Sequence, residues 1–82
     1  MSSKEKFEIN SFYRFIKIKD KEIIKKELDN FFKYKTVKGT ILLSNEGING
    51  SLSGTKSDID KCIKLIKLKL GIKKINSKIN KV

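Results

Sequence analysis

A chain of 82 residues is long enough for one small domain, since autonomous domains usually contain about 50 to 250 residues. Its 20 basic and 9 acidic residues give a net charge of +11, which favours an anionic partner. Histidine is absent and cysteine occurs once, so Ser-His and Cys-His catalysis, most zinc sites and an internal disulfide are excluded, and we expect no metal or other cofactor.

The first elements are read from composition and alternation. Residues 1–9 are mostly polar and charged, which predicts a flexible N-terminal segment before one domain over residues 10–82. Aromatic and β-branched residues then dominate residues 12–18 and predict a first strand. Side chains alternate along a strand, so Phe12, Ile16 and Ile18 share one side with Arg14, and this side is expected to face the core.

Two helices are predicted, each with one apolar stripe. The first is expected to run from a cap at Asp20 to about Tyr34, with a stripe formed by Ile24, Leu28, Phe31 and Phe32. The second is expected to begin after Thr55, because Asp58 follows three residues later as in a capping box, and to end at Gly71. Its stripe contains Ile59, Cys62, Ile63, Ile66 and Leu70.

The remaining strands define the fold class. Residues 38–44 and 48–53 predict two strands joined as an antiparallel hairpin, and residues 72–79 predict a weaker fourth strand. The order β-α-β-β-α-β predicts an α+β, ferredoxin-like (acylphosphatase-like) fold. In that fold a four-stranded antiparallel sheet carries both helices on one face.

The hairpin contains four of the five glycines, and two interpretations stay open. In the conformational one, Gly47 makes the turn with positive φ, Gly50 allows a bulge or a close backbone approach, and Gly54 lets the chain leave the sheet. In the functional one, Glu46 and Asn49 project from the hairpin and contact a ligand. The candidate hairpin residues are therefore Gly39, Glu46, Gly47, Asn49, Gly50 and Gly54.

The same hairpin resembles the N-terminal domain of the rhodanese-type tRNA uridine hydroxylases. That family carries the run Gly-Thr-x-Leu-Leu-x-x-Glu-Gly-Ile-Asn-Gly-Ser/Thr-x-Ala/Ser-Gly after a first strand with an aromatic pair. The run is matched here by Gly39, Thr40, Leu42, Leu43, Glu46, Gly47, Ile48, Asn49, Gly50, Ser51, Ser53 and Gly54. A looser similarity covers about residues 12–72 and includes Phe12, Tyr13, Arg14 and Phe15.

The resemblance implies oxygen-dependent hydroxylation of the wobble uridine of tRNA to 5-hydroxyuridine. The reactive cysteine of that family lies on a rhodanese domain, which this chain does not contain. The chain is then expected to bind tRNA and to pack against the rhodanese domain, but not to catalyse the reaction alone. Cys62 is expected to be a core residue, because it lies on the apolar stripe of the second helix.

Two alternatives from other functional classes stay open. The chain can be a free-standing adaptor that binds RNA or protein, or an acylphosphatase-like hydrolase. The hydrolase needs an arginine near the turn from the first strand to the first helix, whereas Arg14 is expected in the middle of a strand. With no apolar leader and no run of about 18 apolar residues, we expect a cytoplasmic protein without a membrane segment.

The lysines predict where RNA would bind. From Lys61 to Val82 the chain carries lysines and no acidic residue, although AT-rich codon usage also favours lysine and would leave a merely solvated surface. The candidate phosphate contacts are Lys17, Lys38, Lys61, Lys64, Lys67, Lys69, Lys73 and Lys74. Leu65 and Leu68, expected opposite the apolar stripe, are candidates for the interface with the rhodanese domain.

Base stacking on the sheet is expected to contribute less than phosphate contacts. RNA-recognition modules of this architecture stack bases on aromatic side chains of their first and third strands. Tyr13 and Phe15 can serve on the first strand, but the third offers only Asn49, Ser51 and Ser53.

Overall fold

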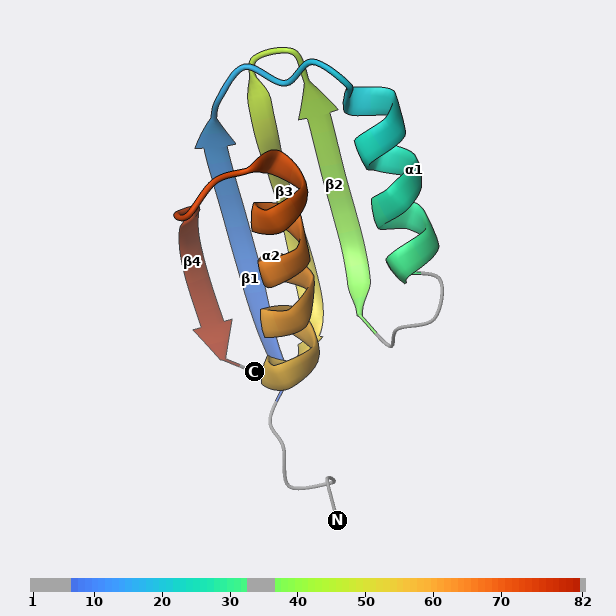
Figure 1. Ribbon diagram of the computed structural model, residues 1–82. Helices are drawn as coiled ribbons and strands as arrows, with labels where there is room; N and C mark the ends of the chain where they lie inside the picture. Colours follow the sequence, from blue (N-terminus) through green and yellow to red (C-terminus); the bar gives the residue numbers. More distant parts are fainter. Residues whose placement is uncertain (1–6, 33–36, 82) are drawn as a thin grey trace.

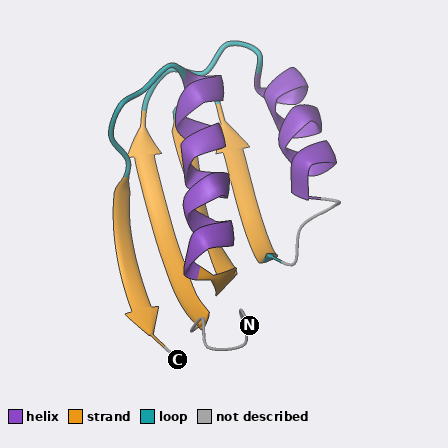
Figure 2. Ribbon diagram, turned by 60° about the horizontal axis from the view of Figure 1, so that its bottom comes forward, coloured by secondary structure: helices purple, strands orange, loops and turns teal. Residues whose placement is uncertain are grey.

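The computed structural model describes residues 7–32 and 37–81 of the chain. Its elements follow the predicted order: β1 (Phe7–Phe15), α1 (Lys21–Phe32), β2 (Lys38–Ser44), β3 (Gly47–Thr55), α2 (Lys56–Leu70) and β4 (Asn76–Lys81). The four strands form one antiparallel sheet in the order β2-β3-β1-β4, and both helices cover the same face of it (Figures 1 and 2). The predicted ferredoxin-like fold is confirmed.

The core lies between the sheet and the two helices. Phe12 and Ile18 are buried, as expected for their side of the first strand, and Leu28 of α1 belongs to the same buried cluster. The stripe of α2 supplies four further buried side chains, Ile59, Cys62, Ile63 and Ile66. Apolar residues at helical spacing on α2 thus share one core with Phe12 of β1 and with Ile48 and Leu52 of β3.

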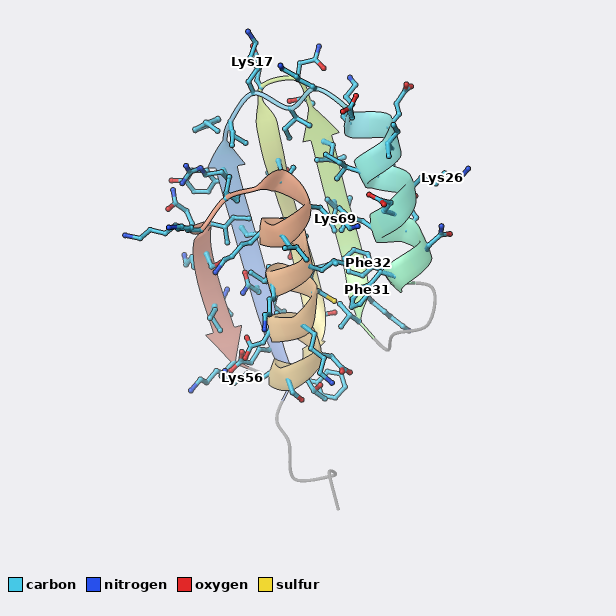
Figure 3. The ribbon with its side chains drawn as sticks, in the orientation of Figure 1. Lys17, Lys26, Phe31, Phe32, Lys56 and Lys69 are labelled. Carbon is cyan, nitrogen blue, oxygen red and sulfur yellow. The ribbon has the colours of Figure 1, made fainter. Side chains whose placement is uncertain are left out.

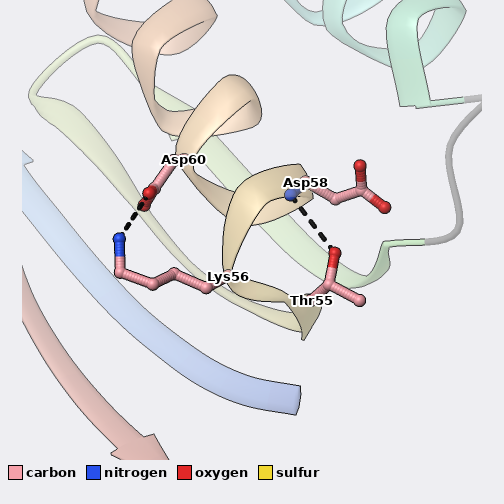
Figure 4. Close-up of polar contacts among 4 residues, drawn as sticks. All are labelled: Thr55, Lys56, Asp58 and Asp60. Carbon is pink, nitrogen blue, oxygen red and sulfur yellow. Dashed lines mark hydrogen bonds and ion pairs between the residues drawn. The ribbon is translucent and has the colours of Figure 1, made fainter. Parts of the chain in front are cut away.

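The ends of α2 are set by local contacts. Thr55 is the N-cap, and its Oγ1 accepts a hydrogen bond of 3.3 Å from the backbone N–H of Asp58 (Figure 4). One turn later, Lys56 and Asp60 form an exposed ion pair at 2.7 Å. Gly71 is the C-cap in the left-handed conformation, and its N–H and that of Ile72 bond to carbonyls of the last turn. Both predicted ends of this helix are confirmed.

The first strand lies earlier in the sequence than expected. It begins at Phe7, so residues 7–9 are paired in the sheet and do not belong to the N-terminal segment predicted over residues 1–9. It ends at Phe15, although Ile16 and Ile18 still donate hydrogen bonds to the Glu46 and Asn45 carbonyls. The buried polar residues Glu8 and Asn10 hid the start of this central strand from a hydrophobicity argument.

The last strand begins later than expected. It covers Asn76–Lys81 rather than residues 72–79, because the N–H of Ile72 is bound to the end of α2 and the Lys74 carbonyl accepts a bond of 3.3 Å from Arg14 Nη1. The chain therefore joins the sheet only after it has crossed from the helix layer. Strand β3 is longer than predicted, and the predicted helix end at Tyr34 lies outside the described residues.

Candidate functional site

The face of the sheet opposite the helices is open, and its side chains follow from the register. Because Phe12 points into the core, its neighbours in β1 point to the open face. The open-face positions of the four strands are occupied by Phe7, Ile9, Ser11, Tyr13, Phe15, Lys38, Thr40, Leu42, Ser44, Asn49, Ser51, Ser53, Thr55, Asn76, Lys78 and Asn80. Aromatic, amide, hydroxyl and lysine side chains are present in this set, whereas acidic side chains are not.

Tyr13 and Phe15 form an exposed aromatic pair on this face. Their ring centroids are 5.6 Å apart and their planes are inclined by 59°. Phe15 is 82% exposed and Tyr13 47%, although aromatic rings of this size are usually buried in part or whole. The pair thus leaves ring surface available to another molecule.

Amide side chains flank Tyr13 on both sides. In the register of the sheet, Tyr13 lies directly opposite Asn49 of β3 and Asn76 of β4. Leu42 of β2 lies opposite Asn49 and continues the row. Four strands therefore contribute to one transverse row with Tyr13 near its middle.

Two recesses meet at Tyr13. The first, here called the aromatic hollow, has a volume of about 260 Å³ and is lined by residues that include Tyr13, Phe15, Ser44, Glu46 and Asn49. The second, the amide hollow, has about 440 Å³ and is lined by residues that include Ser11, Tyr13, Asn49, Asn76 and Lys78. Ligand pockets usually measure about 300 to 1,000 Å³, so the aromatic hollow is smaller than a usual ligand pocket and the amide hollow is at the lower end of the range.

The hairpin turn brings Glu46 to the aromatic hollow. Ser44 pairs with Gly47, and Ser44 Oγ accepts a hydrogen bond of 3.2 Å from the Glu46 N–H. Gly47 has a φ of +156°, which confirms the predicted positive φ at the turn. Glu46 and Asn49, predicted together as candidate contacts, therefore do line one recess, although they lie on the turn and on the strand respectively.

The other candidate glycines have structural positions along the hairpin. A Cβ atom at Gly50 would collide with the Thr40 carbonyl oxygen and the ring of Phe12, which confirms the expected close approach. Gly39 lies opposite Leu52 in the β2–β3 ladder. Gly54 does not release the chain from the sheet as expected, because it is paired with Glu8 inside β3.

The candidate phosphate contacts do not form one patch. Lys17, Lys73 and Lys74 belong to the end of the molecule that carries the hairpin turn, and Figure 3 shows Lys17 pointing away from that end. Lys61 and Lys64 lie on the exposed side of α2, and Lys67 near its end is half-buried. Lys38 begins β2 at the far end of the sheet.

Lys69 differs from the other candidates because it has a protein partner. Its Nζ lies 3.2 Å from Glu27 Oε2, which links α2 to α1. In Figure 3 its side chain points from α2 towards α1, whereas Lys26 points away from the protein. The charge of Lys69 is thus partly compensated within the domain.

A third recess lies between the helices and includes the predicted interface residues. It measures about 260 Å³ and is lined by Phe31, Lys61, Lys64, Leu65 and Leu68. Leu68 is 74% exposed, as expected for a residue opposite the stripe. Leu65 is instead half-buried and packs against the core. Both leucines therefore line one apolar recess.

Two residues weighed for catalysis have structural roles. Cys62 is fully buried, which confirms it as a core residue. Arg14 is one residue from the end of β1, not in the middle of the strand as expected, but its guanidinium donates to the Lys74 carbonyl. Within the described ranges, no three His, Cys, Asp or Glu residues gather where they could hold a metal ion.

Sequence reasoning missed the contributions of Asn76, Lys78 and Leu42 to the open face. Asn76 and Lys78 were assigned to a weak fourth strand with no stated partner. Their proximity to Tyr13 depends on the pairing of β4 with β1, which no local pattern in the sequence reports. Leu42 is a motif residue, but its exposure follows from the register of β2.

The fold and the glycine-spaced hairpin define an acylphosphatase-like α+β domain. Within that class, the chain belongs to the UPF0176 acylphosphatase-like domain family, which matches residues 7–82. The resemblance seen in the hairpin motif is thereby confirmed.

Several relatives of this chain share one name. The tRNA uridine(34) hydroxylase of Prochlorococcus marinus (strain NATL1A) is 43% identical over 77 residues, which cover 92% of this chain and 24% of that protein. The tRNA uridine(34) hydroxylase of Rickettsia bellii (strain RML369-C) is 42% identical over 76 residues, which cover 93% of this chain and 31% of that protein. The tRNA uridine(34) hydroxylase of Staphylococcus epidermidis (strain ATCC 12228) is 50% identical over 52 residues, which cover 63% of this chain and 16% of that protein. The chain thus spans less than a third of the length of each of these relatives.

A membrane-spanning helix is not found in the part of the chain that the structure describes. The longest described helix, α2, has 15 residues and carries lysines along its length. About 20 mostly apolar residues are needed to cross a bilayer as a helix.

Proposed function

We propose that this chain is the N-terminal domain of a tRNA uridine hydroxylase and acts in the modification of the wobble uridine of tRNA in the cytoplasm. The observation that carries the proposal is the match to hydroxylases at 42–43% identity over more than nine tenths of the chain. The chemistry belongs to the rest of such a protein, where a rhodanese domain with its loop cysteine would act as the oxidoreductase. The domain described here would bind tRNA and pack against that part.

The tRNA contact is assigned to the end of the domain that carries the hairpin turn. Lys17, Lys73 and Lys74 are exposed there, and none of them forms an ion pair among the described residues. Lysines attract RNA through its phosphates without reading the sequence. Lys61 and Lys64 remain candidates on α2, while Lys38 lies apart from both groups.

The domain contact is assigned to the recess between the helices. Phe31, Leu65 and Leu68 give it an apolar lining, and Lys61 and Lys64 form its charged rim. An apolar recess with a polar rim is the usual composition of a protein interface. Under the proposed function, the rhodanese domain is the partner that would pack against this recess.

The proposed function is tested on tRNA in cells. Deletion of the gene that encodes this chain should abolish 5-hydroxyuridine at position 34, measured by mass spectrometry of digested tRNA. Reintroduction of the gene should restore it, and a copy with Leu68→Asp should restore less if the helix recess holds the catalytic part. An unchanged level of the modification in the deletion strain would refute the proposal.

A further inference from the structure

We propose that the open face of the sheet around Tyr13 binds unpaired nucleotides of RNA, with a base stacked on the Tyr13 ring. This inference rests on the proposed function for the identity of the RNA, and it adds a specific site and a mode of recognition. Phosphate contacts by lysines would give affinity for any RNA, whereas this face would select single-stranded segments.

The aromatic pair supplies the stacking surface. Tyr13 and Phe15 are two residues apart on one strand, so both rings lie on the open face with their centroids 5.6 Å apart. Both line the aromatic hollow, and both keep exposed ring area. Every base has a flat π-face, so exposed aromatic side chains on a sheet are a common platform for single strands.

Amides beside the ring supply hydrogen bonds to base edges. Asn49 and Asn76 lie directly opposite Tyr13 on the two neighbouring strands, and both line the amide hollow. A carboxamide both donates and accepts, so it can pair with an exposed base edge. Glu46 at the rim of the aromatic hollow adds an acceptor of the kind that binds amino groups of bases.

The charge on this face favours a polyanion over a protein segment. The strand positions of the open face carry Lys38 and Lys78 and no acidic residue among the described residues. Glu46, on the hairpin turn, is the acidic residue that lines the aromatic hollow. The other described acidic side chains lie mostly on the two helices, and Glu8 is buried on the opposite side of the sheet. With Lys17, Lys73 and Lys74 at its upper end, the face joins a stacking surface to phosphate-binding groups.

The sheet register offers a stacking surface on one strand only. RNA-recognition modules of this architecture carry aromatic residues on both the first and the third strand. Here two aromatic residues of β1 are adjacent to each other, and the third strand contributes the Asn49 amide instead. One strand is therefore enough to hold consecutive bases.

The test compares single-stranded and duplex RNA. Fluorescence anisotropy of this chain with labelled heptauridine and with a labelled RNA duplex should show tighter binding of the single strand. Tyr13→Ala should weaken binding of heptauridine by about tenfold, the usual loss for one stacked base, and Tyr13→Phe should retain it within about twofold. The duplex should bind both variants like the wild type.

A matched control uses another exposed aromatic residue of the same strand. Phe7 is 54% exposed and lies about 20 Å from Tyr13 along β1, so Phe7→Ala should leave heptauridine binding unchanged. Circular dichroism and thermal unfolding would establish that all three variants fold.

Three results would overturn the inference. Equal loss on Phe7→Ala and Tyr13→Ala would show that no local site exists. An unaffected heptauridine affinity in Tyr13→Ala, with tRNA still bound, would exclude stacking but leave the proposed function intact. Sedimentation velocity that showed a dimer broken by Tyr13→Ala, with no change in RNA affinity, would assign the face to self-association instead.

Discussion

At the scale of single residues, Gly50 determines how closely β2 and Phe12 approach β3. A methyl group there would meet the Thr40 carbonyl oxygen and the Phe12 ring. Gly50→Ala should therefore lower the free energy of unfolding by about 2 kcal/mol, equivalent to a fall in Tm of about 10 °C, in calorimetry or thermal circular dichroism. Ser51→Ala, at the exposed neighbouring position, should change Tm by only a few degrees. Similar Tm values for the two variants would contradict the close approach.

Cys62 gives a second test at the same scale. Its side chain has no solvent exposure, so its thiol can react only when the domain opens. Reaction with a thiol reagent such as 5,5′-dithiobis(2-nitrobenzoate) should be at least ~100-fold slower under native conditions than in denaturant. Rapid reaction in the folded domain would contradict the assignment of Cys62 to the core and reopen its role in catalysis.

At the scale of elements, the N-cap of α2 has a measurable contribution. Thr55→Ala removes the hydroxyl that accepts the Asp58 N–H and should cost about 1 kcal/mol, or about 4–8 °C in Tm. Thr55→Ser keeps the hydroxyl and should retain most of the stability in the same melting experiment. If serine destabilised as much as alanine, the loss would come from the threonine methyl group rather than from the cap.

The elements also show which structural information is local in the sequence. Helix α2 was predicted with both ends, because Thr55, Asp58 and Gly71 set those ends through neighbours in the chain. The bounds of β1 and β4 were wrong, because they depend on partners distant in the sequence. Glu8 and Asn10 are polar yet buried, since β1 lies between β3 and β4. Element type was thus predictable from periodicity, whereas strand ends were not.

At the scale of the whole molecule, the candidate site was predictable only in part. Glu46, Asn49 and the hairpin glycines were identified from a contiguous motif. Asn76 and Lys78 are far from that motif in the chain and join it through the register of β4 with β1. The separation of the lysines into distinct groups likewise depends on the fold, since the sequence placed all of them except Lys17 and Lys38 in one basic segment.

The net charge of +11 leads to a prediction for tRNA binding as a function of salt. If about four phosphates are contacted, a plot of log affinity against log salt should have a slope of about −3 to −4. The triple variant Lys17→Gln, Lys73→Gln, Lys74→Gln should reduce this slope by about 2 in anisotropy titrations.

Two control variants complete the salt experiment. Lys26→Gln, on the exposed side of α1, should leave the slope unchanged. The double variant Lys61→Gln, Lys64→Gln tests the α2 surface separately. If only that double variant reduced the slope, the phosphate contacts would be assigned to α2 and not to the end of the domain that carries the hairpin turn.

The central claim is that RNA meets the domain on the open face of its sheet. It is tested most directly by ¹H–¹⁵N correlation spectra of this chain, titrated with an unmodified tRNA anticodon stem-loop. The largest shift changes should fall on Tyr13, Phe15, Glu46, Asn49 and Asn76, with smaller changes at Lys17, Lys73 and Lys74. Changes confined to α1 and α2, with the open-face amides unmoved, would contradict the account.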